Sequence, residues 1–329
     1  MPLAECAAGI RINDMLIPML LPITIMPPSA LSARKAVAAL CLLSLIWAYN
    51  WITVKEGLRY ADPFDLAALR TAPGAVLLFA AMAWMKKPLA PVALPRLVLL
   101  GLLQTTGFIS FVCWALVAGA VGKSAVLVYT FPFWTLLFAW PLLGERIRGL
   151  QWLAIGLAAT GLTLILEPWN LGGSFASRIY AVLAGVCWAA SSVIAKRWRN
   201  EGNFDLLSVT AWQMLLGGIA CIVIAWLVPS HPVVWTSHFV LVLGYGIVLG
   251  SVAGWLLWLY ILKHLPAGIA SLGMMAVPAL GVLLSKLQYG EEPGRVEIIG
   301  MLLIGASLAL LSWLTLRGQK SVVPEIGQE

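Results

Sequence analysis

The residues of this chain that could bind or transform a molecule are few, and they stand inside very apolar segments. Arg70 is a strong charge within such a segment, and Asn50 and Gln104 are uncharged amides at similar depth. A buried arginine can neutralise an anionic group such as a carboxylate, and an amide can hydrogen-bond a polar solute. Each has a structural alternative. Arg70 can snorkel to the membrane interface with a carbonyl or Asp65 as partner, and the amides can bond neighbouring helices.

Groups that catalyse reactions or bind metals are missing from the apolar segments. The 14 acidic residues and the three histidines fall in expected loops, tails or segment ends. The sequence has no HExxH pair, no serine nucleophile elbow and no Walker loop, and its five scattered cysteines include no CxxC pair. We therefore predict no enzyme activity, no metal and no cofactor. The same absence leaves the energy source open, a coupling ion or proton included.

The composition is that of a chain solvated mostly by lipid. Hydrophobic residues make up 61% of the 329 residues and charged residues only 11%, against about 25% charge in soluble domains. The net charge of +7 does not indicate nucleic-acid binding, because the basic residues are spread over short loops. At ~20 residues per span, about ten helices fit. The expected spans are 36–55, 64–85, 95–117, 124–143, 149–167, 178–197, 205–228, 237–262, 267–288 and 296–316.

An internal repeat divides the chain into two halves of about five spans each. Three motifs occur once per half, in the same order and 140 to 146 positions apart. An odd number of spans per repeat inverts one half relative to the other in the membrane, which is the architecture of secondary transporters. We predict an all-α integral membrane protein with ten transmembrane helices as two inverted five-helix repeats. The motif pairs are Trp47-Ala48-x6-Lys55 with Trp188-Ala189-x6-Lys196, Phe64-Asp65-Leu66 with Phe204-Asp205-Leu206, and Pro132-x11-Gly144-Glu145 with Pro278-x11-Gly290-Glu291.

The distribution of basic residues predicts the orientation. With the amino terminus in the cytoplasm, 14 lysines and arginines fall on the cytoplasmic side and 5 on the other, so the positive-inside rule places both termini in the cytoplasm. The predicted parts are an N-terminal tail over 1–35, disordered or interfacial, a first repeat over 36–168, a second over 178–316 and a cytoplasmic tail over 317–329.

Prolines and glycines mark two further features of the spans. Pro132 and Pro278 stand at equivalent points of the fourth and ninth spans, where a lost backbone hydrogen bond makes either a hinge or a static kink. Gly246, Gly250 and Gly254 line one face of the eighth span. Glycines at this spacing allow close approach of another helix, so we predict a packing face.

These motifs together resemble the EamA family of the drug/metabolite transporter superfamily. The resemblance covers about 36–316 and includes Pro266-Ala267-Gly268-x-Ala270-Ser271 ahead of Pro278. It implies a ten-helix carrier with a central cavity between the repeats and transport by alternating access. Ser192, one of the matching residues, can instead bond within its own helix. The cavity residues that the resemblance implies are Trp47, Asn50, Gln104, Tyr129, Trp188, Ser192, Trp255 and Met275, and Arg70 joins them as a candidate counter-charge.

The favoured function is efflux of a small organic solute across the bacterial cytoplasmic membrane. The aromatic and amide residues indicate an amphipathic solute such as an amino acid, a related metabolite or a drug-like compound. An importer of a nucleoside or sugar-like solute is an alternative within the class. A non-transporting scaffold or an intramembrane enzyme is the alternative outside it. The expected partners are the solute and the lipid bilayer, and a homodimer is left open.

Overall fold

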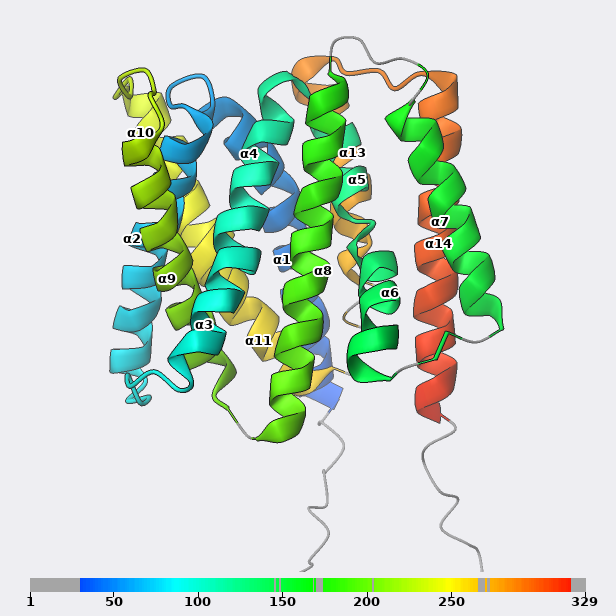
Figure 1. Ribbon diagram of the computed structural model, residues 1–329, viewed down its shortest axis with the longest axis horizontal. Coiled ribbons are helices and arrows are strands. Elements are labelled where there is room, and N and C mark those ends of the chain that lie inside the picture. Colours follow the sequence, from blue (N-terminus) through cyan, green and yellow to red (C-terminus); the bar gives the residue numbers. More distant parts are fainter. Residues whose placement is uncertain are drawn as a thin grey trace, which may run out of the picture.

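The computed structural model describes residues 30–320 except 145, 148, 168, 170–173, 203, 266–269 and 271–272. The predicted tails over 1–35 and 317–329 therefore lie mostly outside the described residues. Within the described ranges the regular elements are all helices, which stand side by side as one bundle (Figure 1). This is the expected outcome for apolar segments in lipid, because a helix satisfies its backbone polar groups within the segment.

The helices of the first half fill residues 30 to 166. Those of the second half begin at Phe175. The first set is α1 (Ala30–Gly57), α2 (Pro63–Trp84), α3 (Leu94–Leu100), η2 (Gly101–Gly107), α4 (Phe108–Ala118), α5 (Val121–Val128), α6 (Phe131–Leu143) and α7 (Leu150–Leu166). The second set is α8 (Phe175–Glu201), α9 (Leu206–Leu227), α10 (Ser237–Tyr245), η3 (Gly246–Ala253), α11 (Gly254–His264), α13 (Ala276–Tyr289) and α14 (Arg295–Lys320).

Eight segments of the described chain are long and apolar enough to cross a membrane, and α7 is a shorter apolar helix. They match nine of the ten expected spans. The expected ninth span, 267–288, is represented by α13 from Ala276 onward, with undescribed residues ahead of it. The start of α1 and the end of α14 lie at the same end of the bundle (Figure 1). The protein is thus an all-helical, multi-pass membrane protein.

The fourth span is broken rather than merely kinked. Its helix stops at Val128 and restarts at Phe131, with Tyr129 and Thr130 in a turn between α5 and α6. Pro132 has no backbone N–H to donate to the Val128 carbonyl, and this lost hydrogen bond falls at the break. A turn at Met275 stands in the same position relative to Pro278, three residues ahead of it.

The third and eighth spans each contain a π-helical stretch, where the sequence predicts regular helices. These stretches, η2 and η3, widen the turn at corresponding places of the two halves. Thr106 Oγ1 donates to the Gly101 carbonyl at 3.4 Å, and Ser251 Oγ donates to the Gly246 carbonyl at 3.0 Å, five residues back in both cases. π-Helical stretches are rare within α-helices, and those that occur often lie at functional sites.

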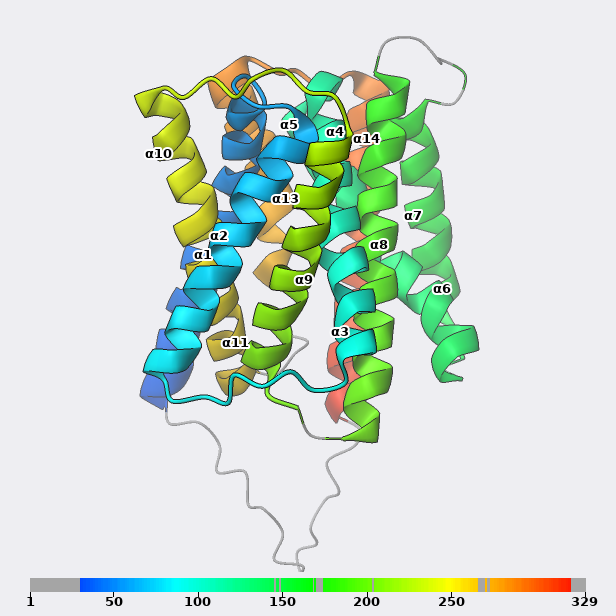
Figure 2. The same ribbon diagram turned by 60° about the vertical axis from the view of Figure 1, so that its left-hand side comes forward.

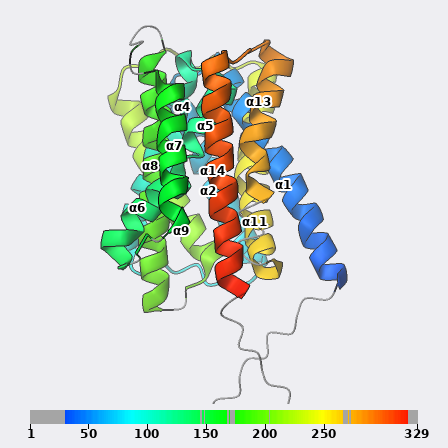
Figure 3. The same cartoon turned by 90° about the vertical axis from the view of Figure 1, so that its right-hand side faces the viewer.

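Helix packing follows one pattern in both halves. α1 packs on α11 and α13, while α8 packs on α4, α5 and α6. α2 packs on α9, with the two helices antiparallel and side by side (Figure 2). α7 packs on α14, and this pair is seen at the front of the bundle in Figure 3. Equivalent spans of the two halves thus pack against equivalent partners.

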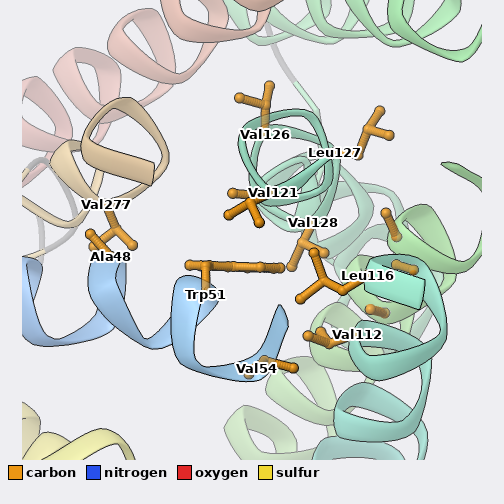
Figure 4. Packing of buried hydrophobic residues seen from close by; sticks show 14 of the residues in the cluster. Ala48, Trp51, Val54, Val112, Leu116, Val121, Val126, Leu127, Val128 and Val277 are labelled. Carbon is orange, nitrogen blue, oxygen red and sulfur yellow. The ribbon is translucent and has the colours of Figure 1, made fainter. Parts of the chain in front are cut away.

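The largest group of buried hydrophobic residues lies where α1 meets α4, α5 and α13. Trp51 points from α1 toward Val121 and Val128 of α5, and Ala48 lies against Val277 of α13 (Figure 4). All five side chains are less than 10% exposed. This core fixes the first span of one half against the ninth span of the other.

Candidate solute-binding site

Three tryptophans from both halves of the chain meet in the middle of the bundle. Trp47 of α1 lies with its ring centroid 6.1 Å from that of Trp255 of α11, at an interplanar angle of 71°. Trp188 of α8 stacks on the other side of Trp255, with 5.9 Å between centroids and an angle of 12°. We name Trp47, Trp188 and Trp255 the tryptophan cluster. All three are predicted solute-binding residues.

A second row of aromatic rings continues from Trp188 to the helix break of the fourth span. The ring of Phe131 lies 5.9 Å from Trp188 and 5.7 Å from Tyr129. Phe108 of α4 covers Trp188 at 4.7 Å. Tyr129, also a predicted site residue, is therefore linked to the tryptophan cluster through one phenylalanine. Its position in the turn ahead of Pro132 places it where the helix can change direction.

The predicted polar residues Asn50 and Arg70 contact each other. Arg70 Nη2 of α2 donates to Asn50 Oδ1 of α1 at 3.0 Å, and Thr53 Oγ1 donates to the Asn50 carbonyl at 2.9 Å. Arg70 is only 6% exposed, and its guanidinium bonds Asn50 rather than Asp65. Its Nε atom is buried without a hydrogen-bond partner, and no carboxylate oxygen of the described chain lies within 4 Å of the guanidinium. Asn50 thus bonds a neighbouring helix, as its structural alternative predicts.

The glycine face of the eighth span holds these residues in place. A Cβ added at Gly250 would lie 2.5 Å from Asn50 Oδ1, and one added at Gly254 would lie 2.4 Å from Trp47 Nε1. Trp47 Nε1 donates to the Gly250 carbonyl at 3.1 Å, and a Cβ at Gly246 would lie 3.3 Å from Arg70 Nε. The prediction of a packing face is confirmed.

The side chains of the remaining three predicted site residues form no hydrogen bond or ring contact with the side chains of these residues within the described chain. Ser192 Oγ donates to the Trp188 carbonyl at 2.8 Å, within its own helix. Met275 Sδ accepts from Ser312 Oγ at 3.5 Å. Gln104 is half-buried on η2, and no hydrogen bond or ring contact within the described residues links it to the tryptophan cluster. The structure therefore brings together six of the nine residues in two groups, an aromatic group that includes Trp47 of α1 and a polar pair that includes Asn50 of α1.

The described structure has hollows away from the tryptophan cluster. Two cavities of about 390 Å³ each share Phe64 and Trp114 as lining residues. The first opens where α1 ends and α2 begins and includes Asp65, and the second lies between α2, α4, α8 and α9. Neither is lined by any of the nine predicted residues. All three tryptophans of the cluster are partly exposed. Phe64 and Asp65 of the repeated Phe-Asp-Leu motif line the first cavity.

Comparison with known proteins identifies the family. The profile of the EamA-like transporter family matches residues 34–167 and again residues 176–313. The chain belongs to the EamA-like transporter family. The double match means that both halves carry the same family pattern. Family membership places the protein among membrane transporters.

Individual relatives of this EamA-family transporter are distant. It is 25% identical over 276 residues to the uncharacterized transporter YoaV of Bacillus subtilis, covering 82% of this chain and 94% of that protein. It is 24% identical to the uncharacterized inner membrane transporter YedA of Escherichia coli strain K12, covering 83% and 89% of the two chains.

A third relative carries a functional name, and a solved structure shares the fold. The chain is 24% identical to a probable amino-acid metabolite efflux pump of Escherichia coli strain K12, covering 89% of this chain and 99% of that protein. A solved crystal structure matches with a TM-score of 0.61 at 21% identity, over 87% of this chain and 99% of the other. That likeness supports the fold alone.

Proposed function

We propose that this EamA-family protein is a secondary transporter that moves a small organic solute out of the cell by alternating access. Its architecture is ten spans in two inverted repeats, 36–168 and 178–316, with both termini in the cytoplasm. The membrane is the bacterial inner membrane. Membership in a family of membrane transporters supports the class, and the geometry of the two halves supports the mechanism.

The packing pattern supports the inverted repeats. Equivalent spans use equivalent partners: α1 with α11 and α13, and α8 with α4, α5 and α6. The two copies of the Phe-Asp-Leu motif stand at the starts of α2 and α9, which run antiparallel side by side (Figure 2). Copies of one motif at opposite ends of the bundle are what an inverted repeat requires.

The tryptophan cluster is the observation that carries the proposed mechanism. It joins rings from α1, α8 and α11, three spans of both halves, at the place where the repeats meet. Rocking of one repeat against the other would separate Trp188 from Trp255 and open a space lined by aromatic faces. Pro132 and Pro278, each three residues after a turn in its helix, are the proposed hinges.

An amino acid or related metabolite is the proposed solute. The relative named a probable amino-acid metabolite efflux pump supports this class and the outward direction. Aromatic faces suit an apolar side chain, while Asn50 and Arg70 can receive polar groups once the helices part. Arg70 is the proposed counter-charge for the solute carboxylate, because no carboxylate within the described ranges neutralises it at 4 Å.

A ligand screen followed by flux measurement tests the proposal. The full-length protein in detergent is heated with amino acids, nucleosides and amines in turn. A solute at 100 times its Kd raises the free energy of unfolding by about 2.7 kcal/mol. The stabilising solute is then loaded with the protein into proteoliposomes, and its flux is measured for the wild type, Trp188→Ala and Arg70→Gln.

The expected result is flux by the wild type and loss of flux in Trp188→Ala. Trp226→Ala is the matched control, because Trp226 is 84% exposed on the lipid-facing surface. Its flux should equal that of the wild type. Arg70→Gln should lose flux selectively for carboxylate solutes. Equal flux in all four proteins, or no flux of any stabilising solute, would contradict the proposal.

A further inference from the structure

The cavity at the junction of α1 and α2 is lined by a carboxylate with one oxygen that has no hydrogen-bond partner among the described residues. Asp65 lines this cavity, and its Oδ2 atom is buried without a hydrogen-bond partner. A buried acceptor without a donor is costly, and a charged one more so. Because the great majority of buried polar atoms are paired, this unpaired oxygen marks Asp65, which lines the cavity, as an acceptor for a partner from outside the chain.

The cations of the cavity are bound to other groups. Lys55 Nζ donates to the Leu116 carbonyl at 2.7 Å and to the Gly119 carbonyl at 3.0 Å, at the carboxyl end of α4. Arg59 Nη1 lies 3.3 Å from Glu56 Oε2.

The histidine that lines the cavity also has another partner. His231 contacts Asp62 Oδ2 through its backbone N–H at 2.7 Å and its Nδ1 at 3.1 Å. None of the three basic side chains in the lining has Asp65 as its partner.

The second copy of the motif shows which partner is missing. Asp205 occupies in Phe204-Asp205-Leu206 the place that Asp65 occupies in Phe64-Asp65-Leu66. Lys87 Nζ lies 2.5 Å from Asp205 Oδ2, and the Ser208 N–H donates to Oδ1 at 3.0 Å. An ammonium group therefore neutralises this carboxylate in the second half. In the first half, the equivalent carboxylate of Asp65 lines a cavity instead of pairing with a lysine.

The rest of the lining is aromatic and apolar. Phe64 and Trp114 pack edge to face at 5.8 Å between ring centroids and lie between the two cavities. Aromatic faces attract cations and cover apolar groups. A volume of about 390 Å³ is in the range of small-molecule pockets, roughly 300 to 1,000 Å³.

We infer that the cavity is a binding site for an amphipathic primary amine, with the ammonium on Asp65 and the apolar part against Phe64 and Trp114. The site lies at the end of the bundle opposite the start of α1. The inference rests on the proposed function in that an ammonium-bearing solute, including an amino acid, would meet this site at the outer face. It narrows the solute class to compounds with a free amino group.

Binding of two isosteric probes to the full-length protein in detergent tests the site. 2-Phenylethylamine is protonated at neutral pH, and 2-phenylethanol has the same shape without the charge. The wild type should bind the amine at least about tenfold more tightly than the alcohol in titration calorimetry, because the charge-assisted hydrogen bond is the stronger one. Asp65→Asn should lose this preference. Asp205→Asn, the same change in the other motif copy, should keep it.

Equal affinity of the wild type for both probes would overturn the inference without any variant, so a misfolded Asp65→Asn protein does not leave it undecided. A full preference for the amine in a folded Asp65→Asn protein would also overturn it. The outcome is separable from that of the proposed function. Amine binding without any flux would contradict transport and keep the site, whereas flux that is indifferent to Asp65→Asn, with no amine preference, would remove the site and keep transport.

Discussion

Burying Arg70 costs free energy because its charge loses contact with water. Its guanidinium is buried in an apolar bundle, and its one hydrogen bond within the described chain goes to the neutral Asn50 side chain. An amide oxygen compensates part of the desolvation, whereas the Nε atom remains without a partner. A buried charge held this way is stable only while Asn50 stays in place. The pair therefore ties α1 to α2 in the closed centre.

Asn50→Leu should destabilise the protein. The substitution keeps a similar volume and leaves the Arg70 guanidinium buried without its acceptor, which costs about 1–3 kcal/mol. Thermal unfolding in detergent measures the loss. The double variant Asn50→Leu/Arg70→Leu should recover much of it, because both partners of the bond are then apolar. A folded Asn50→Leu protein with unchanged stability and altered flux would instead assign Asn50 to the solute path.

Asp205 gives the protein a pH dependence at the loop after α8. Partial burial alone would raise the pKa of this carboxyl, but the hydrogen bonds from Lys87 and the Ser208 N–H outweigh it and lower the pKa below its usual value. A lowered folded-state pKa adds stability above the unfolded pKa of about 3.9, and this stability disappears as the pH falls through the folded value.

Asp205→Asn should therefore lower stability at neutral pH by about 1 kcal/mol, through loss of the ion pair and weakening of the helix cap. The difference from the wild type should shrink as the pH falls below about 4. Unfolding temperatures of both proteins between pH 7 and pH 3 measure it. A difference that stays constant over this range would show that the carboxylate charge contributes nothing.

The sequence could indicate which residues matter at this scale better than how they pair. Trp47 and Trp188 were recognisable because each stands in one of the two copies of the same motif. The contact between Asn50 and Arg70 was not, because the rotation of α1 against α2 depends on a third helix far along the chain. The sequence singled out Asp65 as part of a repeated motif and as a possible partner of Arg70. Its lack of an ammonium partner was recognised only by comparison with the surroundings of Asp205.

The eighth span organises the centre through its glycines. The α10–η3–α11 segment brings its backbone against Trp47, Asn50 and Arg70 by leaving out side chains at Gly246, Gly250 and Gly254. Because Trp47 donates to the Gly250 carbonyl, the close approach also satisfies a polar group in the membrane. The π-helical stretch η3 occupies the same place, so the contact and the irregular backbone coincide.

Gly250→Ala should destabilise the packing of α1 on η3. The added Cβ would lie 2.5 Å from Asn50 Oδ1, and overpacking of this kind costs typically 1–3 kcal/mol. Gly244→Ala is the matched control in the same span, since a Cβ there meets nothing within 4 Å. It should be neutral or slightly stabilising. Equal unfolding temperatures for the two variants would show that the glycine face does not set the helix distance.

The helices themselves could largely be predicted from hydrophobicity, since span length is set by the bilayer. Their irregularities could not. A proline marks a lost hydrogen bond but does not say whether the helix bends or stops, and the fourth span stops at Val128. The π-helical stretches have no composition signal of their own. The structure shows them at corresponding places of the two halves, as η2 and η3.

At the scale of the whole molecule, the packing pairs imply a relation between the halves that sequence motifs alone could not show. The repeated motifs indicate duplication, but duplication with either orientation would leave the same sequence pattern. The antiparallel contact of α2 with α9 supports the proposed inverted orientation (Figure 2). A parallel arrangement of the two halves would place the starts of both helices at one end of the bundle.

The proposed membrane orientation can be measured with reporter fusions. The loop between α2 and α3 lies at the end of the bundle where α1 starts and α14 ends, and the loop between α9 and α10 lies at the opposite end (Figure 2). Basic residues are more frequent on the first of these sides, which the positive-inside rule assigns to the cytoplasm. Reporters fused at residue 90 and after residue 329 should therefore both report the cytoplasm, and one at residue 233 should report the outside.

Three contrary outcomes of that experiment have different meanings. A carboxyl terminus found outside while residue 90 is found in the cytoplasm would require an odd number of spans and would remove the ten-span architecture. Residues 90 and 233 found on one side would remove the inversion of the halves, because the second and seventh spans would then be parallel. If all three reporters are reversed together, the bundle and its inverted repeat remain intact, but the Asp65 cavity opens to the cytoplasm. The amine site would then meet the solute at entry rather than at release.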